Sequence, residues 1–174
     1  GIEIVRKRHY HEYDTYFRQA DPSQGRLRYR EDEFIGENGE ITNVRSRLTL
    51  IGETREKSHL NGEEIMLSRS RYLAPATQSL RFYREYFKPV AIEEIVKDRR
   101  RFLIKFEGTE FFVNLDEVTK PNLGKFVEIK SRTWSRQDAQ HKVKLMQKLL
   151  EALGLASQPL VTKDYIYLVE EGEE

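Results

Sequence analysis

The sequence predicts an α+β protein, mainly β, in which antiparallel strands close into a barrel, or tunnel, with flanking helices. Most of the chain consists of short stretches in which polar and apolar residues alternate, and turn-forming residues separate these stretches. Helical spacing appears only in the middle and near the end, which argues against parallel strands joined by crossover helices. The 174 residues fit a single domain that covers residues 1–174.

Strands are expected wherever the alternation has a period of two. Asn61 and Gly62 form a dipeptide that favours a tight hairpin turn. The expected strands cover residues 5–17, 26–31, 44–51, 65–73, 92–106, 110–118 and 125–132, and a last edge strand covers residues 165–169.

Two helices are expected between these strands. Apolar residues recur at helical spacing within residues 77–87. The second helix follows Ser135, a good N-cap, with Asp138 in position to complete a capping box. Gly154 is suited to the left-handed conformation that commonly ends a helix, so we expect this helix to stop there.

The composition excludes several classes of protein. Cysteine is absent, which rules out disulfides, thiolate metal sites and cysteine nucleophiles. No stretch approaches the ~18 apolar residues of a membrane span, and no signal peptide is visible. We therefore expect a cytoplasmic protein without a membrane partner. The net charge of +1 gives no general attraction to nucleic acid, so nucleic acid is not the expected partner, and the oligomeric state is left open.

Several of the expected strands carry basic residues on one face. For any one strand the ordinary interpretation is a polar face in solvent. Here five strands share the feature with few glutamate partners, and the planar guanidinium group suits the oxygens of phosphate. A barrel with a central channel would place this face inside, around a multiply charged anion such as a triphosphate or polyphosphate. The candidate phosphate-binding residues are Arg28, Arg30, Arg45, Arg47, Lys97, Arg99, Arg101, Lys130 and Arg132.

Asp116 and Glu128 interrupt this basic lining. Carboxylates among cations suggest a hard divalent metal that bridges to phosphate oxygens, and Mg²⁺ typically uses one or two carboxylates together with phosphates and water. Alternatively, each carboxylate simply neutralises a neighbouring arginine. Spacing alone leaves both interpretations open.

At these residues the chain resembles the CYTH domain, also called the triphosphate tunnel metalloenzyme family. That family includes thiamine triphosphatases, inorganic triphosphatases and class IV adenylyl cyclases. The similar stretches occur in the family order. They are residues 14–17 (Asp-Thr-Tyr-Phe), 27–31 (Leu-Arg-Tyr-Arg-Glu), 48–52 (Leu-Thr-Leu-Ile-Gly), 96–99 (Val-Lys-Asp-Arg), 113–118 (Val-Asn-Leu-Asp-Glu-Val) and 123–130 (Leu-Gly-Lys-Phe-Val-Glu-Ile-Lys).

The resemblance implies a strand-lined tunnel that binds a triphosphate lengthwise and hydrolyses it with Mg²⁺ or Mn²⁺. Carried over by position, Arg28, Arg30, Lys97 and Arg99 would hold phosphate, and the last two would also be the catalytic residues. The two carboxylates described above would hold the metal. The resemblance does not say which triphosphate is used, or whether a cyclase product forms.

Three departures from the family pattern bear on activity. The family begins with a Glu-x-Glu-x-Lys strand and a helix, and the thirteen residues before Asp14 leave no room for both. The nearest string, at residues 3–7, lacks the second glutamate, so we expect a domain without the family's first strand and helix. The family lysine in the third motif is Ile51, and the second glutamate of the final strand is Lys130. Lysine cannot ligate a cation.

Two functions follow as hypotheses. The first is a metal-dependent triphosphatase, in which water attacks a terminal phosphoryl group. The second is a catalytically weakened module that binds a nucleotide or polyphosphate and is fused to an upstream domain. A nucleic-acid-binding barrel, suggested by the run Arg99-Arg100-Arg101, is a weaker third reading. His9 and His11 share a strand face, but no third ligand is evident, so we interpret them as ordinary strand positions.

Overall fold

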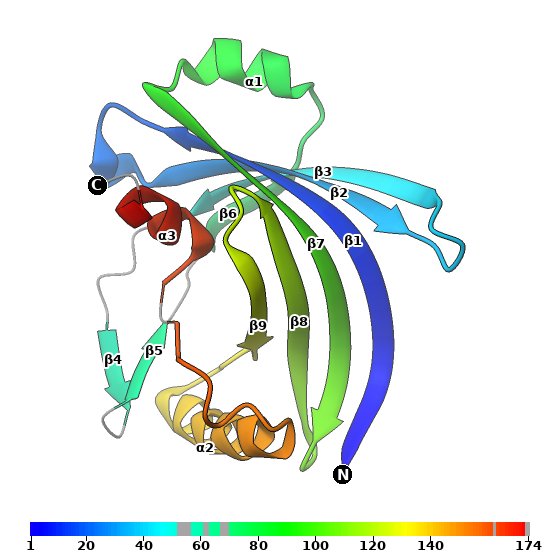
Figure 1. The fold of residues 1–174 in the computed structure, drawn as a ribbon. Helices are drawn as coiled ribbons and strands as arrows, with labels where there is room; N and C mark the ends of the chain where they lie inside the picture. Colours follow the sequence, from blue (N-terminus) through cyan, green and yellow to red (C-terminus); the bar gives the residue numbers. More distant parts are fainter. Residues whose placement is uncertain (52–56, 61–62, 67–69, 162, 173–174) are drawn as a thin grey trace.

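A computed structural model of the protein describes residues 1–51, 57–60, 63–66, 70–161 and 163–172. Within these residues the main body is one antiparallel sheet of seven strands, with three helices and a separate two-stranded hairpin (Figure 1). The strands are β1 (Ile2–Arg18), β2 (Arg26–Ile35), β3 (Ile41–Ile51), β4 (Lys57–Leu60), β5 (Glu63–Met66), β6 (Ser70–Pro75), β7 (Ala91–Phe106), β8 (Thr109–Lys120) and β9 (Gly124–Lys130). The helices are α1 (Leu80–Phe87), α2 (Arg136–Ala152) and α3 (Tyr165–Gly172), and a short 3-10 turn spans Pro22–Gln24.

The seven-stranded sheet joins two halves that are each local in sequence. Its strand order is β6-β3-β2-β1-β7-β8-β9, so β1 to β3 pair in turn on one side and β7 to β9 on the other. β1 and β7 are the longest strands, with 17 and 16 residues. They pair along almost their whole length, from Ile2 opposite Phe106 to Arg18 opposite Ala91. This long-range pairing brings the side chains of both halves onto common surfaces.

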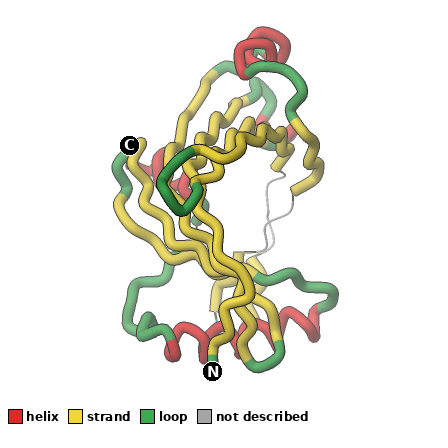
Figure 2. Tube along the Cα trace, turned by 90° about the vertical axis from the view of Figure 1, so that its right-hand side faces the viewer, coloured by secondary structure: helices red, strands yellow, loops and turns green. Residues whose placement is uncertain are grey.

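The sheet is strongly curved, and its strands arch around a central space (Figure 1, Figure 2). Among the described residues the hydrogen-bonded order ends at β6 on one side and at β9 on the other. The closed barrel expected from the sequence is therefore not seen between these strands. Strands β4 and β5 pair with each other as a separate hairpin and extend neither edge of this sheet.

That hairpin refines one prediction. The expected turn at Asn61 and Gly62 lies outside the described residues, but the strands on either side of it pair antiparallel, with Leu60 opposite Glu63. The strand expected over residues 65–73 is confirmed at its two ends, and residues 67–69 between them lie outside the described residues. These two ends have different partners, since β5 pairs with β4 and β6 pairs with β3.

Helices α1 and α2 cover the two ends of one face of the sheet, as their apolar spacing predicts. Tyr83 of α1 is buried with Phe17 of β1 and Leu27 and Tyr29 of β2. Similarly, α2 buries apolar side chains against β7 and β8 at the other end, and this cluster comprises Leu145, Leu149, Ile104, Phe106, Phe111 and Val113. Burying a large apolar side chain contributes about 1.5–3 kcal/mol, so these two clusters hold both helices on the sheet.

Helix α3 lies on the other face of the sheet. Ile166 of α3 is buried against Tyr16, Ile95 and Val118, which belong to three neighbouring strands. The edge strand expected over residues 165–169 is therefore wrong. The short apolar run at these positions is compatible with either a strand or a helix, and the tertiary contacts with the sheet decide for the helix.

The local signals for α2 are confirmed at both ends, except that the Asp138 carboxylate accepts from the Trp134 N–H and not from the Ser135 N–H that a capping box would use. The Asp138 N–H donates to Ser135 Oγ over 3.1 Å, which satisfies one free donor at the start of the helix. At the other end Gly154 has φ +72°, and the Leu155 N–H donates to the Leu150 carbonyl over 2.8 Å, as in a Schellman motif. None of the helices in the described part of the chain is both long enough and apolar enough to cross a bilayer.

Candidate functional site

The strand register gathers the predicted basic residues on one face of the sheet, here called the charged face. Arg30 of β2 lies opposite Asp14 of β1 and Arg47 of β3, and Arg99 of β7 lies opposite Asp116 of β8. Side chains that are directly opposite each other in antiparallel strands project to the same side. The charged face comprises Arg8, Tyr10, Glu12, Asp14, Arg28, Arg30, Asp32, Arg45, Arg47, Lys97, Arg99, Arg101, Asn114, Asp116, Glu128 and Lys130.

Of the predicted site residues, all of which the structure describes, Arg132 alone lies outside the charged face. Strand β9 ends at Lys130, so the strand expected to reach residue 132 is two residues shorter. The Arg132 carbonyl accepts a hydrogen bond from Lys142 Nζ of α2, and its side chain is exposed. Arg132 therefore belongs to the connection between the sheet and α2.

Buried ion pairs form the centre of the charged face. Arg30 donates two hydrogen bonds to Asp14, over 2.5 and 2.6 Å, and Lys97 donates a third over 2.9 Å. Glu12 Oε2 lies 3.2 Å from Lys97 Nζ and 3.3 Å from a guanidinium nitrogen of each of Arg30 and Arg99. The side chains of Glu12 and Asp14 are both only 1% exposed. Charges this deeply buried are tolerated only when each is paired and hydrogen-bonded.

A second set of pairs joins β7, β8 and β9. Arg99 forms a bidentate pair with Asp116, over 2.7 and 2.5 Å, and also donates to Glu128 over 3.0 Å. Glu128 accepts a further hydrogen bond from Asn114 Nδ2 over 2.8 Å and lies 2.7 Å from Lys130 Nζ. Both carboxylates proposed as metal ligands are thus engaged by cationic donors.

The third set lies at the β2–β3 side and leaves polar atoms without partners. Asp32 is fully buried, and its Oδ2 accepts from Arg45 over 2.8 Å and from Arg47 over 2.7 Å. Four buried atoms of the charged face have no hydrogen-bond partner among the described residues, namely Glu12 Oε2, Asp32 Oδ1, Arg28 Nε and Arg47 Nε. Buried polar atoms are normally satisfied, so such atoms mark a place where a ligand or water belongs.

The pKa values report the same electrostatics. Burial raises the pKa of Asp14, but the nearby Arg30 and Lys97 outweigh it and hold that pKa well below its ordinary value. In the same way Lys130 and Arg99 overcome the effect of burial and lower the pKa of Glu128 to about 2. Burial and the neighbouring Arg99 lower the pKa of Arg101. The carboxylates therefore stay ionised, while Arg101 retains positive charge that its surroundings do not fully compensate.

The two ends of the charged face differ. At one end α3 covers it, where Tyr165 donates a hydrogen bond to Asp116 Oδ2 over 2.6 Å and its ring lies 5.5 Å from Lys97 Nζ. At the other end the face opens into a pocket of about 140 Å³. The pocket is lined by Arg6, Arg8, Tyr10, Arg101, Leu103 and Phe112. The charged face is therefore basic and aromatic at its open end and covered by α3 at the other.

Sequence reasoning missed three carboxylates of this site, Glu12, Asp14 and Asp32, and also its members Arg8, Tyr10 and Asn114. It expected basic strands with few acidic partners, and that expectation is wrong. On the charged face five carboxylates stand among nine basic side chains, which leaves a net charge of +4. The signal was available in part, because Glu12 and Asp14 alternate with apolar or aromatic residues as the arginines do. Their pairing with Lys97 depends on the long-range register of β1 and β7.

The donor set on the charged face suits Mg²⁺ or Mn²⁺ in type but not in its present arrangement. Asp116, Asn114 and Glu128 offer oxygens side by side on β8 and β9, and oxygen ligands are what these cations prefer. However, Arg99, Lys130 and the Tyr165 hydroxyl already occupy the carboxylates. Arg99 would have to leave Asp116 before a cation could bind there. Within the described residues, neither carboxylate belongs to a group of three close metal-ligating side chains.

Comparison with known proteins supports the fold. No protein-family model matches the chain, and no curated protein matches it. Among solved structures it is similar to the PH1819 protein from Pyrococcus horikoshii OT3, with 20% identity, a TM-score of 0.61, and 99% of this chain and 86% of that chain covered. It is also similar to a conserved hypothetical protein from Pyrococcus furiosus, with 20% identity, a TM-score of 0.56, and 97% of this chain and 86% of that chain covered. At this identity the likeness concerns the overall fold.

Proposed function

We propose that the protein binds a triphosphate or polyphosphate on the charged face. The observation that carries the proposal is the excess of arginine on one face of the curved sheet, together with the buried Nε atoms of Arg28 and Arg47, which have no partner among the described residues. Phosphate oxygens are the natural acceptors for unpaired guanidinium donors, since they bind two donors of one fork at once.

Five basic side chains of the charged face divide into two groups by exposure. Arg30, Lys97 and Arg99 have side chains that are 3–8% exposed and locked to carboxylates, so they hold the face together. Arg28 and Arg47 have side chains that are 20% and 24% exposed, and they keep donors free for a ligand. We assign contact with phosphate to the second group.

Arg101 belongs with this second group. Its side chain is 24% exposed and lines the pocket at the open end of the charged face. A polyanion that enters there meets Arg6, Arg8 and Arg101 first, and then the paired residues at the centre. A tunnel around the ligand, with α3 closing its far end, is part of this proposal.

Hydrolysis with Mg²⁺ or Mn²⁺ is the second candidate function. The observation that favours it is the row of oxygens from Asp116, Asn114 and Glu128 beside the arginines. A phosphate group that competes for Arg99 would free Asp116 from its present partner. The metal, when bound, would neutralise phosphate charge and activate water. The extensive pairing of the carboxylates favours binding alone, so hydrolysis is left to the experiment.

The test is calorimetric binding of tripolyphosphate to the intact chain, with phosphate release measured in parallel with Mg²⁺, with Mn²⁺ and with EDTA. We expect the double variant R28Q/R47Q to bind roughly 100-fold more weakly, because a hydrogen bond to a charged group contributes about 1.5–3 kcal/mol. Arg100→Gln is the matched control, since Arg100 is exposed on the opposite face of β7.

The outcomes separate the candidates. Tight binding without phosphate release in any metal supports a binding module, and metal-dependent release supports a hydrolase. If R28Q/R47Q and Arg100→Gln weaken binding equally, the attraction comes from general surface charge and the assignment to the charged face is wrong. Absence of any binding contradicts both candidates.

A further inference from the structure

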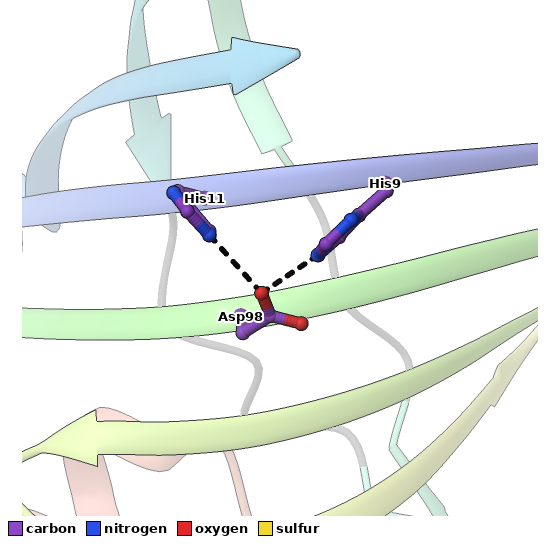
Figure 3. Close-up of side chains that lie close together, drawn as sticks. All are labelled: His9, His11 and Asp98. Atoms are coloured by element: carbon purple, nitrogen blue, oxygen red, sulfur yellow. Dashed lines mark hydrogen bonds and ion pairs between the residues drawn. The ribbon is translucent and has the colours of Figure 1, made fainter. Parts of the chain in front are cut away.

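A cluster of two histidines and one aspartate lies on the opposite face of the sheet, away from the charged face. His9 and His11 alternate along β1 and so project to the same side, and Asp98 of β7 is directly opposite His11. Figure 3 shows both imidazole rings directed at the one carboxylate. His9 Nε2 lies 2.7 Å and His11 Nε2 lies 3.2 Å from Asp98 Oδ2.

We infer that this cluster, here called the His-Asp site, binds a divalent transition metal such as Zn²⁺ through His9, His11 and Asp98. One ligand atom from each residue lies within 4.8 Å of the others. Tetrahedral Zn²⁺ with bonds of about 2.0–2.1 Å holds its ligand atoms roughly 3.4 Å apart. The separation between His11 and Asp98 already matches that value. The separation between His9 and Asp98 must widen by about 0.7 Å, which a small side-chain rotation supplies.

A carboxylate on the far side of His11 supports this assignment. Glu33 Oε2 of β2 lies 3.6 Å from His11 Nδ1, and the Tyr13 hydroxyl donates to the same oxygen over 3.3 Å. A neutral His11 that gave its only proton to Asp98 would direct a lone pair at Glu33. With Nε2 on a metal, the proton sits on Nδ1 and faces Glu33 instead. Closing the 3.6 Å separation by about 0.4 Å would complete the hydrogen bond that usually joins a metal-bound histidine to its supporting carboxylate.

The ligand types and the exposure of the site define the class of metal. Two imidazole nitrogens and one carboxylate oxygen suit Zn²⁺, Co²⁺, Ni²⁺ or Fe²⁺ better than Mg²⁺ or Ca²⁺. The His9, His11 and Asp98 side chains are 30%, 42% and 34% exposed, so an ion can reach them from solvent. Three protein ligands leave at least one coordination position for water or another ligand.

The neighbouring charges do not forbid a cation. Arg100 lies opposite His9 in the register and on the same face, and it brings one positive charge to the site. Asp98 and Glu33 bring two negative charges, so the sum over these groups is negative. The assignment is independent of the proposed phosphate binding, because the His-Asp site faces away from the charged face.

The experiment is titration of the untagged, chelator-treated protein with Zn²⁺ by calorimetry and with Co²⁺ by visible absorption. We expect one equivalent of metal and a Co²⁺ spectrum typical of four- or five-coordinate sites. His9→Gln, His11→Gln and Asp98→Asn should each weaken binding about 100-fold or more, and Glu33→Gln about 10-fold. His141→Gln, which removes an exposed histidine on α2, is the matched control and should bind as the parent does.

Circular dichroism checks that each variant is folded. We expect all of them to fold, because the substituted side chains are partly exposed. Stoichiometric binding that is lost in the three ligand variants and kept in His141→Gln establishes the site. No binding by the parent, or equal binding by all variants, overturns the inference. Tripolyphosphate binding measured on the same variants should stay unchanged, which separates this result from the proposed function.

Discussion

Replacing Asp14 with asparagine tests the buried network of the charged face most directly. Asp14 accepts two hydrogen bonds from Arg30 and one from Lys97, and its side chain is 1% exposed. Asparagine has nearly the same shape, but it removes the charge and turns an N–H₂ group towards a cationic donor. In the variant, the buried Arg30 and Lys97 therefore share one carboxylate, that of Glu12, where the parent has two.

The magnitude follows from what is left unpaired. Removing one partner of a buried ion pair typically costs about 3–5 kcal/mol. For a chain of this size each kilocalorie lowers the midpoint of thermal unfolding by about 2–4 °C, so the expected shift is roughly 6–20 °C. Glu94→Gln is the control, because Glu94 pairs with Lys120 at the surface, where their side chains are 47% and 64% exposed. An exposed pair of this kind contributes about 0–1 kcal/mol.

The assay is urea unfolding at neutral pH, followed by circular dichroism and repeated with tripolyphosphate. Asp14→Asn raises the net charge of the charged face from +4 to +5, so the ligand should stabilise this variant more than it stabilises the parent. A loss of less than about 1 kcal/mol, equal to that of the control, would refute the burial of Asp14 in an ion-pair network. Equal stabilisation by the ligand in variant and parent would refute the placement of phosphate on this face.

Three further outcomes are expected. The free energy of unfolding of the parent should fall as pH is lowered from about 4.5 to about 2. The reason is that Asp14 and Glu128 have lowered pKa values in the folded state, so their protonation there works against their cationic partners. Urea unfolding across this pH range measures the change, and a flat profile would contradict the pairing. Tyr165→Phe removes the hydrogen bond to Asp116 and should lower the free energy of unfolding by about 1 kcal/mol, which thermal unfolding measures. An unchanged stability would place α3 away from the charged face. Leu149→Ala, in the fully buried contact of α2, should lower the free energy of unfolding in urea by about 2–5 kcal/mol. The affinity for tripolyphosphate, measured by calorimetry, should stay unchanged, and a reduced affinity would link α2 to the site.

Much of the charged face could be predicted because strand geometry is local. Alternation with a period of two decides which residues share a face, so Arg28 with Arg30, and Lys97 with Arg99, could be grouped without knowing any partner strand. The caps of α2 are equally local, since Ser135 contacts a residue three positions away. These inferences needed only the conformation of a few consecutive residues.

The partners of those residues could not be predicted in the same way. Glu12 and Asp14 meet Lys97 only because β1 pairs with β7 in one register across more than eighty residues. A register shift of one residue would turn these carboxylates to the opposite face. The same pairing supplies Asp98 to His9 and His11, which is why the sequence showed two histidines without a third ligand.

The sequence by itself determined a mainly antiparallel β protein with a basic strand face, because side-chain periodicity and caps are properties of neighbouring residues. Only the tertiary structure decided that the sheet stays open between β6 and β9, that residues 165–169 form a helix, and that five carboxylates neutralise much of the basic face. Each of these depends on contacts between distant segments. Such contacts are selected because the folded chain as a whole must bury its apolar surface and pair its charges, and no short stretch of sequence encodes them.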